Sequence, residues 1–370
     1  MEHITIEECC DILDSRRIPI TASERRNGRY PYYGANGIQD YVADYIFDDE
    51  LVLLAEDGGN FGSKTRPIAY RVSGKCWVNN HAHVLKPMAN VDVDYLCYSL
   101  MFYDTEELVN GATRQKLTQT AMRKMLIPQR SLQEQKRIVC ELSKVQSIIS
   151  ARQQQLQKLD ELVKARFIEI FGIYPANPKG WETGTIRDVV SDVRYGSSRP
   201  AVDGGKYPYL RMNNITYGGE LDLSDTKRID IPDNELDKCT VRHGDVLFNR
   251  TNSKELVGKT CVYNRDDMMV LAGFVIRVRV SERILPEFLS EFLNTEFSKR
   301  MLLAMCKTAI GQANINAQEM QNIGLYLPPI ELQRKFVQFK EQIDKSKVAV
   351  QKALDEAQLL FDSLMQKYFG

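Results

Sequence analysis

The sequence lacks several features that would place it in a common protein class. Its 49 basic and 49 acidic residues balance over 370 positions, which argues against a protein that coats nucleic acid through its overall charge. None of the eight cysteines forms a CxxC pair, so neither a zinc site nor a redox couple is indicated, and reduced thiols are expected. The first residues, MEHITIEECCDIL, show no secretory signal, and no apolar run is long enough to cross a membrane. We therefore expect a cytoplasmic protein without a membrane contact.

Signatures of catalysis are missing as well. The segment VGKT at 257–260 ends like a phosphate-binding loop, but Ser253 stands where the GxxxxGK(S/T) pattern needs a glycine. No GxGxxG follows a strand-like segment, and neither an HExxH zinc motif nor an NPPY-like element of an adenine methyltransferase occurs. We expect a chain that is not a catalyst by itself and that holds no metal or cofactor of its own.

Two histidines close together, His81 and His83, come nearest to a metal site. Their spacing in NNHAH could place both rings on one face of a strand, which is compatible with a metal ion or a catalytic base. Because the sequence offers no third ligand nearby, we expect a structural role. The adjacent acids Glu56 and Asp57 precede two glycines and an asparagine, so a turn is expected there.

What the sequence does contain is a long internal repeat. Residues 126–172 align without a gap on residues 324–370. Both copies open on a proline-bearing turn and continue as a charged or glutamine-rich helix. The identical positions include Gln135 with Gln333, Val139 with Val337, Leu156 with Leu354, Phe171 with Phe369, and Gly172 with Gly370.

The two repeated helices carry apolar residues at alternating steps of four and three, which is the pattern of a coiled-coil seam. Each helix could instead lie on the folded segment that precedes it. The length of the helices and the matching seams favour pairing with each other. The predicted seam comprises Leu142, Val145, Ile149, Leu156, Leu159 and Val163 in the first helix, and Ile343, Val350, Leu354, Phe361 and Leu364 in the second.

The segments that precede the two helices also resemble one another. YPYYGANGI at 30–38 is similar to YPYLRMNNI at 207–215, and GATRQKLT at 111–118 aligns with AIGQANIN at 309–316 at the offset of the helices. Each mixes β-rich stretches, such as LVLLAE at 51–56 and WVNNHAHVLK at 77–86, with helical ones. The sequence thus predicts an α+β protein built twice, with a first lobe (1–128), a central helix (129–172), a second lobe (173–328) and a C-terminal helix (329–370).

Polar residues in the turns of both lobes are candidates for contacts with nucleic acid. Asn and Gln pair with adenine and Arg with guanine, whereas Lys contacts phosphates. A solvated polar loop is the alternative for each turn. The candidates are Lys64, Arg66, Arg114, Gln115 and Lys116 in the first lobe, and Ser198, Arg199, Arg211, Asn213, Asn249, Arg250, Asn252, Lys254, Gln312 and Asn314 in the second.

Over essentially its whole length the chain resembles the specificity subunit of type I restriction-modification systems. The resemblance rests on the helix starts RSLQEQKRIV and PPIELQRKFV, on the paired helices, and on the phrases DVLFNRTNSKELVGKT and GQANIN. The first helix start departs from the family pattern, with Arg130 and Ser131 where prolines are usual.

This resemblance implies a specific division of labour. Each lobe would be a target-recognition domain that reads one half of a split, asymmetric site in double-stranded DNA, and an antiparallel coiled coil of the two helices would set the unread gap. The helical regions would dock two methyltransferase subunits, and restriction subunits with motor and nuclease activity would join that core. Catalysis, with S-adenosylmethionine, ATP and magnesium, would belong to these partners.

The residues alone leave two other classes of protein open. One is an enzyme such as a stand-alone nuclease, which turnover by the purified chain would indicate. The other is a coiled-coil assembly protein whose lobes bind protein, for which binding would depend only weakly on salt.

Overall fold

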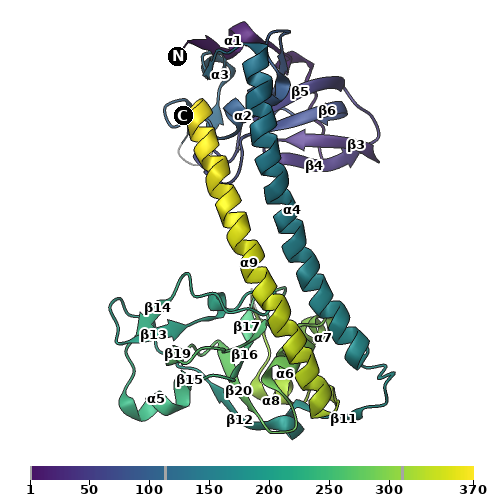
Figure 1. Cartoon of the computed structure of the whole chain (residues 1–370), viewed down its shortest axis with the longest axis vertical. Coiled ribbons are helices and arrows are strands. Elements are labelled where there is room, and N and C mark those ends of the chain that lie inside the picture. Colours follow the sequence, from purple (N-terminus) through teal and green to yellow (C-terminus); the bar gives the residue numbers. More distant parts are fainter. Residues whose placement is uncertain (1, 112–114, 310–311) are drawn as a thin grey trace. The chain divides into compact units, whose positions relative to one another are not determined.

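The structure, a computed structural model, describes residues 2–111, 115–309 and 312–370 (Figure 1). By its internal contacts the chain divides into two compact units, Met1–Gln154 with Gln351–Gly370, and Gln155–Val350. These units cut through both long helices, whereas the sequence predicted boundaries at the helix ends. The difference arises because each half of a helix packs against the lobe and the half-helix beside it.

The two repeated segments form helices α4 (Leu132–Phe171) and α9 (Ile330–Phe369), shown in teal and yellow in Figure 1. In the first compact unit, Leu142 from the first half of α4 lies in one apolar cluster with Phe361 from the second half of α9. In the second unit, Phe167 from the end of α4 packs edge-on against Phe336 from the start of α9, with ring centroids 5.2 Å apart. The helices therefore pair antiparallel, as predicted.

Residues of the predicted seam pack between the helices near both ends of the pair. Leu142, Val145 and Ile149 share a cluster with Leu354 and Phe361 in the first compact unit. All predicted seam residues are buried or half-buried, namely Leu142, Val145, Ile149, Leu156, Leu159, Val163, Ile343, Val350, Leu354, Phe361 and Leu364.

A buried glutamine near the start of α4 joins this helix to the first lobe. The Gln135 amide donates to the carbonyls of Asn90 and Arg130 at 3.1 and 2.9 Å, and its oxygen accepts the N–H of Asp92 at 2.7 Å. Asp92 is the N-cap of α2 (Val93–Met101). One side chain thus satisfies three backbone groups where the lobe meets the helix.

Gln333 makes the same three bonds in the second lobe. Its amide donates to the carbonyls of Arg283 and Pro328 at 3.4 and 2.8 Å, and its oxygen accepts the N–H of Leu285 at 2.8 Å. Leu285 is the N-cap of α6 (Pro286–Asn294). This shared bonding explains why glutamine occurs at this position in both copies of the repeat.

The phenylalanines shared by both copies of the repeat lie at the C-terminal ends of the helices. Phe171, the last residue of α4, contacts Phe288 of α6 with ring centroids 4.8 Å apart. Phe369, the last residue of α9, contacts Tyr95 of α2 at 5.3 Å. Each helix therefore starts on its own lobe and ends in an aromatic contact with the core helix of the other lobe.

The first lobe is built on a six-stranded sheet in the order β2-β7-β5-β6-β3-β4, antiparallel except where β3 meets β6. Its centre is the fully buried run 51–55 of β5. The sheet strands are β2 (Cys10–Ile12), β3 (Asn27–Gly34), β4 (Gly37–Val42), β5 (Phe47–Ala55), β6 (Ala69–Val78) and β7 (Ala82–Pro87). The remaining elements besides α2 are β1 (His3–Thr5), α1 (Ile6–Cys9), η1 (Asp14–Arg16), β8 (Val109–Asn110), β9 (Lys116–Leu117), α3 (Gln119–Arg123) and β10 (Leu126–Pro128).

The second lobe divides its strands among smaller sheets, with orders β12-β20-β16-β18, β14-β13-β19-β15, β17-β22-β21 and β11-β23. Its strands are β11 (Glu182–Thr185), β12 (Val190–Tyr195), β13 (Tyr207–Leu210), β14 (Lys227–Ile229), β15 (Thr240–Val241), β16 (Val246–Asn249), β17 (Thr251–Asn252), β18 (Thr260–Val262), β19 (Met269–Leu271), β20 (Val275–Val280), β21 (Lys307–Ala309), β22 (Gln312–Asn314) and β23 (Gly324–Leu327). Its helices besides α6 are η2 (Ile186–Val189), η3 (Met212–Asn214), α5 (Asp233–Cys239), α7 (Glu296–Met305) and α8 (Ala317–Gln321). Within the described ranges, no helix combines the length and apolar character needed to cross a membrane.

Candidate nucleic-acid interface

Predicted contact residues from distant parts of the second lobe meet at one edge. The segment between β16 and β18 carries Arg250, Asn252 and Lys254, and β17 within it pairs with β22, so that Asn252 lies opposite Ala313. The N–H of Ile315 also bonds to the Arg250 carbonyl at 2.9 Å. Part of each of the two sequence phrases, Thr251–Asn252 and Gln312–Asn314, therefore lies in one small sheet, β17-β22-β21.

The glycine-rich turn after β12 lies against the same edge. A Cβ atom on Gly196 would lie 2.2 Å from the Leu271 carbonyl oxygen, so only glycine allows this approach. The backbones of Ser197 and Gly273 are hydrogen-bonded to each other, because the Gly273 N–H donates to the Ser197 carbonyl at 2.7 Å. Arg250 joins this layer because its N–H bonds to the Phe274 carbonyl at 3.0 Å.

Arg250 is held by an aromatic ring. Its guanidinium lies over the ring of Tyr195, 4.9 Å from the centroid, and Nη1 donates to the Gly273 carbonyl at 3.5 Å. Tyr195 itself is fixed because its hydroxyl accepts the Ala317 N–H at 2.9 Å. Stacking restricts the orientation of the guanidinium, which favours directional recognition of a planar acceptor pair.

The prediction of a base contact for Asn249 is wrong in this conformation. The residue is fully buried, and its amide donates to the carbonyls of Thr251 and Phe274 at 3.1 and 3.2 Å. Its oxygen accepts from the Asn252 amide at 3.0 Å. Asn249 therefore holds the loop in shape, and a buried side chain cannot reach a base edge.

The other predicted residues of the second lobe differ in how accessible their side chains are to a ligand. Arg199 pairs with Glu235 at 2.7 Å and Arg211 with Asp225 at 2.8 Å, so a phosphate would have to compete with a carboxylate for either one. Asn314 is half-buried, and the side chain of Gln312 lies outside the described part of the chain. The exposed candidates are Ser198, Asn213, Lys254 and, despite its ion pair, Arg199.

Two lysines that the sequence analysis did not select lie behind this loop. Lys259 is buried and donates to the Met212 carbonyl at 2.9 Å, which joins the η3 turn to the loop. Lys299 donates to the Gly258 carbonyl at 3.0 Å, and burial, with Lys259 and Lys164 nearby, lowers its pKa to about 8. Isolated lysines carry no sequence signal, because burial and like charge arise only from the fold.

In the first lobe, the predicted residues lie on two segments that touch. Lys64 and Arg66 are exposed between β5 and β6, and Gln115 and Lys116 are exposed at β9. The Gln115 carbonyl accepts the N–H of Gly58 at 3.1 Å. Arg114 lies outside the described residues.

A hollow of about 610 Å³ opens beside these segments, between β3, β4 and the turn after β6. Its lining includes the side chains of Arg25, Asn36, Gln39 and Asn80. The Arg25 guanidinium lies over the Tyr32 ring, 4.3 Å from the centroid. Amides and a stacked guanidinium are groups that recognise base edges, so this hollow extends the candidate interface.

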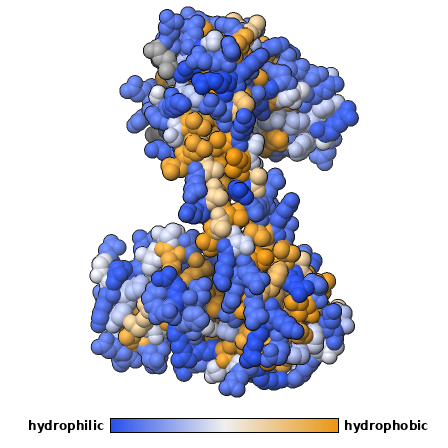
Figure 2. Space-filling model, viewed as in Figure 1, coloured by the Kyte–Doolittle hydropathy of each residue, from blue (hydrophilic) through white to orange (hydrophobic). Residues whose placement is uncertain are grey.

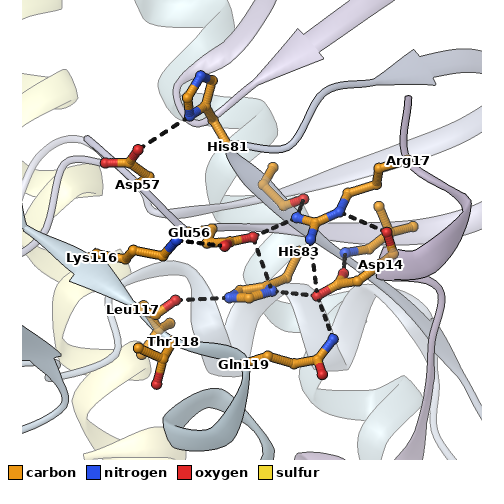
Figure 3. A network of polar contacts seen from close by, with 12 residues as sticks. Asp14, Arg17, Glu56, Asp57, His81, His83, Lys116, Leu117, Thr118 and Gln119 are labelled. Carbon is orange, nitrogen blue, oxygen red and sulfur yellow. Dashed lines mark hydrogen bonds and ion pairs between the residues drawn. The ribbon is translucent and has the colours of Figure 1, made fainter. Parts of the chain in front are cut away.

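Beneath the first-lobe segments lies a buried charged cluster (Figure 3). The His83 ring, fully buried in β7, lies 2.6 Å from the Asp14 carboxylate, and Glu56 accepts a hydrogen bond from Arg17 at 2.5 Å. One ligand atom each from Asp14, Glu56 and His83 lie within 4.8 Å of one another. Asp14 provides a potential third ligand near the histidines. Local sequence does not indicate this, because Asp14 comes from a segment that is distant in the chain.

This cluster is already satisfied without a metal ion. The two oxygens of Asp14 accept the N–H of Val84 at 2.9 Å, the His83 ring, and the Gln119 amide at 2.9 Å. Glu56 also pairs with Lys116 at 3.2 Å. These bonds favour the structural role expected for His83, in which the carboxylates are neutralised by protein cations.

Comparison with known sequences identifies the family of this two-lobed chain. The type I restriction modification DNA specificity domain matches residues 1–161 and 178–357, which together make up most of the chain. The chain therefore belongs to this family.

Its relatives share the name of one type of subunit. A Methanocaldococcus jannaschii protein named the type I restriction enzyme MjaVIII specificity subunit is 24% identical over 93% of this chain and 86% of its own length. The EcoKI specificity subunit of Escherichia coli is 27% identical over 49% of this chain, and a Haemophilus influenzae chain named as a specificity subunit is 37% identical over 36%. These last two matches span only 40% and 34% of the relatives' own lengths.

Solved structures show the same fold. A type I restriction-modification S subunit from M. genitalium matches the whole chain and 96% of its own, with a TM-score of 0.59 at 14% identity. A chain from a structure on assembly of the type I restriction-modification system gives a TM-score of 0.55 at 18% identity, over 97% of that chain.

Proposed function

We propose that this chain is the DNA-specificity subunit of a type I restriction-modification complex and that it recognises a bipartite, asymmetric target. Each lobe reads one half-site, and the α4–α9 pair sets the number of base pairs left unread. The observation that carries the proposal is that each lobe, joined to its helix by an equivalent glutamine, exposes basic and amide side chains among the predicted contact residues, namely Lys64, Arg66, Gln115 and Lys116 in the first lobe and Arg199, Asn213 and Lys254 in the second.

The helices offer surfaces for methyltransferase subunits. In the first compact unit, Ile148 of α4 and Leu359 and Leu360 of α9 are exposed, and Figure 2 shows apolar side chains over the helices. Exposed apolar patches of this kind mark interaction sites. We infer that two methyltransferase subunits dock on the helices and that restriction subunits join this core.

In this scheme the chain selects the sequence and its partners perform the chemistry. The methyltransferase subunits bind S-adenosylmethionine, and the restriction subunits use ATP and magnesium. The side chains at the lobe edges then act only as readers: arginine and amide groups on base edges, and lysines on phosphates.

Mapping of methylated adenines in a host that expresses the complete system tests this proposal. We expect methylation within a two-part motif whose halves are separated by a gap of constant length. A continuous motif, or methylation without sequence preference, would contradict the two-reader scheme.

A protein-binding role for the lobes is the competing function, and salt separates the two. Phosphate contacts release counterions, so the affinity for duplex DNA should fall steeply between about 50 and 200 mM salt. An affinity of the lobes for a protein partner that changes little over that range would favour the assembly protein instead.

A further inference from the structure

The guanidinium of Arg25, in the segment before β3, is oriented by a buried ring. It lies over the ring of Tyr32, 4.3 Å from the centroid. Tyr32 is only 1% exposed, and its hydroxyl donates to the Ile20 carbonyl at 3.3 Å. Stacking on a fixed ring restricts the plane of the guanidinium, so its donors point in defined directions.

Most donors of this guanidinium have no acceptor in the protein. Within the described residues it makes one hydrogen bond, from Nη1 to the Asp40 carboxylate at 3.5 Å, which is longer than usual for such a bond. Its Nε is buried and has no partner in the described part of the chain. An unpaired buried donor destabilises a fold, so stability alone does not account for an arginine held in this way.

Amide side chains line the same hollow as Arg25. The Asn36 amide donates to the Gly58 carbonyl at 3.0 Å, and the Gln39 oxygen accepts from the Asn79 amide at 3.1 Å. An amide offers both donors and acceptors, as base edges do, whereas a phosphate only accepts. The carboxylate of Asp57 also lines the hollow and would repel a phosphate. The lining therefore suits a base edge better than the DNA backbone.

The second lobe contains an equivalent arrangement made from other residues. Arg250 lies over the Tyr195 ring, its Nη1 donates to the Gly273 carbonyl at 3.5 Å, and its Nε is buried without a partner among the described residues. In the similar segments YPYYGANGI and YPYLRMNNI, however, Tyr32 aligns with Tyr209. Each lobe thus holds one stacked arginine in the same bonding state, although the sequence similarity between the lobes does not align the two rings.

We propose that Arg25 reads a guanine in the half-site bound by the first lobe, with Nη1 and Nη2 donating to O6 and N7 of the base. Guanine carries two neighbouring acceptors on its major-groove edge, and a guanidinium matches them with two parallel donors. The long bond from Nη1 to Asp40 is exchanged for this contact. Arg25 is then a specificity-determining residue. This inference rests on the proposed function and adds to it a base and the residue that reads the base.

Replacement of single acceptor atoms in the DNA tests the contact. The complex with its methyltransferase subunits is offered the mapped target in which each guanine, on either strand and in both half-sites, is replaced in turn by 7-deazaguanine, which lacks the N7 acceptor. We expect one replacement in the first-lobe half-site to weaken binding by the wild type about tenfold. Arg25→Ala should bind the unmodified target about tenfold more weakly and should no longer distinguish the two bases at that position.

Two further variants separate base reading from a contact with phosphate. Arg25→Lys keeps the charge but cannot present two parallel donors, so it should lose the discrimination between the two bases as Arg25→Ala does. Arg123→Ala is the matched control, because Arg123 of α3 pairs with Glu7 at 3.0 Å and is not among the residues that line the hollow. It should bind and discriminate as the wild type does.

Each outcome supports or overturns the proposal. A first-lobe half-site without guanine on either strand overturns it, as does a wild-type complex that binds its target but tolerates every 7-deazaguanine in that half. If Arg25→Ala weakens binding of all duplexes equally and keeps the discrimination, Arg25 contacts phosphate instead. Should Arg25→Ala fail to fold, Arg25→Lys decides by the same measurement. If the wild-type complex prefers no duplex at all, the proposed function itself fails, and this inference fails with it.

Discussion

Gln135 shows how much a single side chain contributes to the join between lobe and helix. It satisfies two carbonyls and one N–H in the interior of the first compact unit. Truncation in Gln135→Ala leaves these groups without partners, and we expect a loss of at least about 2 kcal/mol in the free energy of unfolding. Trp77 is the tryptophan of the first unit and Trp181 that of the second, so urea unfolding followed by Trp77 fluorescence in a Trp181→Phe background measures this.

Gln133, two residues earlier and exposed, provides the control. Gln133→Ala should unfold within about 0.5 kcal/mol of the parent, as is usual for surface positions. Equal stability of the two variants would show that the Gln135 bonds contribute nothing.

Asp14 should make the first lobe sensitive to acid. Burial raises the pKa of Asp14, but hydrogen bonding and charge from His83, with the bonds from Val84 and Gln119, outweigh it and hold the pKa below its usual value. A carboxyl group of this kind adds stability above its unfolded pKa, and that stability is lost as pH falls through the folded pKa.

We therefore expect the wild type to lose stability below about pH 4 and Asp14→Asn, although less stable at pH 7, to lose less over the same interval. Urea midpoints from pH 3 to 7, read from Trp77, measure both. Parallel curves for the two proteins would assign the acid sensitivity to other groups.

Arg250 is the sharpest candidate for base recognition in the second lobe. Its guanidinium is oriented by Tyr195, and loss of a bidentate base contact costs about 1 to 3 kcal/mol. We expect Arg250→Ala to weaken binding of one half-site by this amount and to relax its sequence preference, measured with duplexes substituted at single positions.

Arg265 is the matched control for this substitution. It follows the far end of β18, away from the loop that carries Arg250, and pairs with Asp267 at 2.6 Å. Arg265→Ala should leave affinity unchanged. A uniform weakening by Arg250→Ala over all sequences would identify Arg250 as a phosphate contact.

For single residues, the sequence indicated which turn carries candidate polar side chains, but it did not indicate the role of each side chain. Arg250 and Asn252 were selected together with Asn249, because all three are polar residues in one turn. Burial separates them: Asn249 bonds within the loop, whereas Arg250 stacks on a ring from β12. Neither fact can be read from local sequence, since both depend on strands that are far apart in the chain.

Among the elements, α4 and α9 define the length of the spacer in the proposed function. Removal of one heptad from each helix, at facing positions, shortens the pair by about 10 Å, which corresponds to about three base pairs at roughly 3.4 Å each. We expect a gap that is shorter by about this number and unchanged half-sites, measured by mapping methylated adenines.

Removal of a heptad from only one helix is the control, because it breaks the register of the seam. That variant should lose stability and methylation. If the paired deletion leaves the gap unchanged, the helices do not set the spacing.

The helices were also the elements most accessible to prediction. A seam such as Leu142, Val145 and Ile149 repeats along a single segment, so periodicity alone indicates which residues are buried. The strands were harder. The stretch 77–86 was predicted as one β-rich segment, but a turn at 79–81 separates β6 from β7, and the buried pairing of Asp14 with His83 follows from that arrangement.

For the whole molecule, the duplication was visible in the sequence because the few residues that join each lobe to the helices occur in both copies. Gln135 and Gln333 make equivalent bonds, and Phe171 and Phe369 each end on the core helix of the other lobe. The lobes themselves differ in their sheets, because the equivalent anchors fix only the contacts between lobe and helix. Such divergence fits two readers of different half-sites.

The central claim is that two lobes read two half-sites, and competition binding tests it most directly. The chain, in complex with its methyltransferase subunits, would be offered the mapped target and two duplexes in which one half or the other is scrambled. Our account predicts that each scrambled duplex binds at least about 100-fold more weakly than the intact target, since several specific base contacts are lost. Equal affinity for all three duplexes would contradict it.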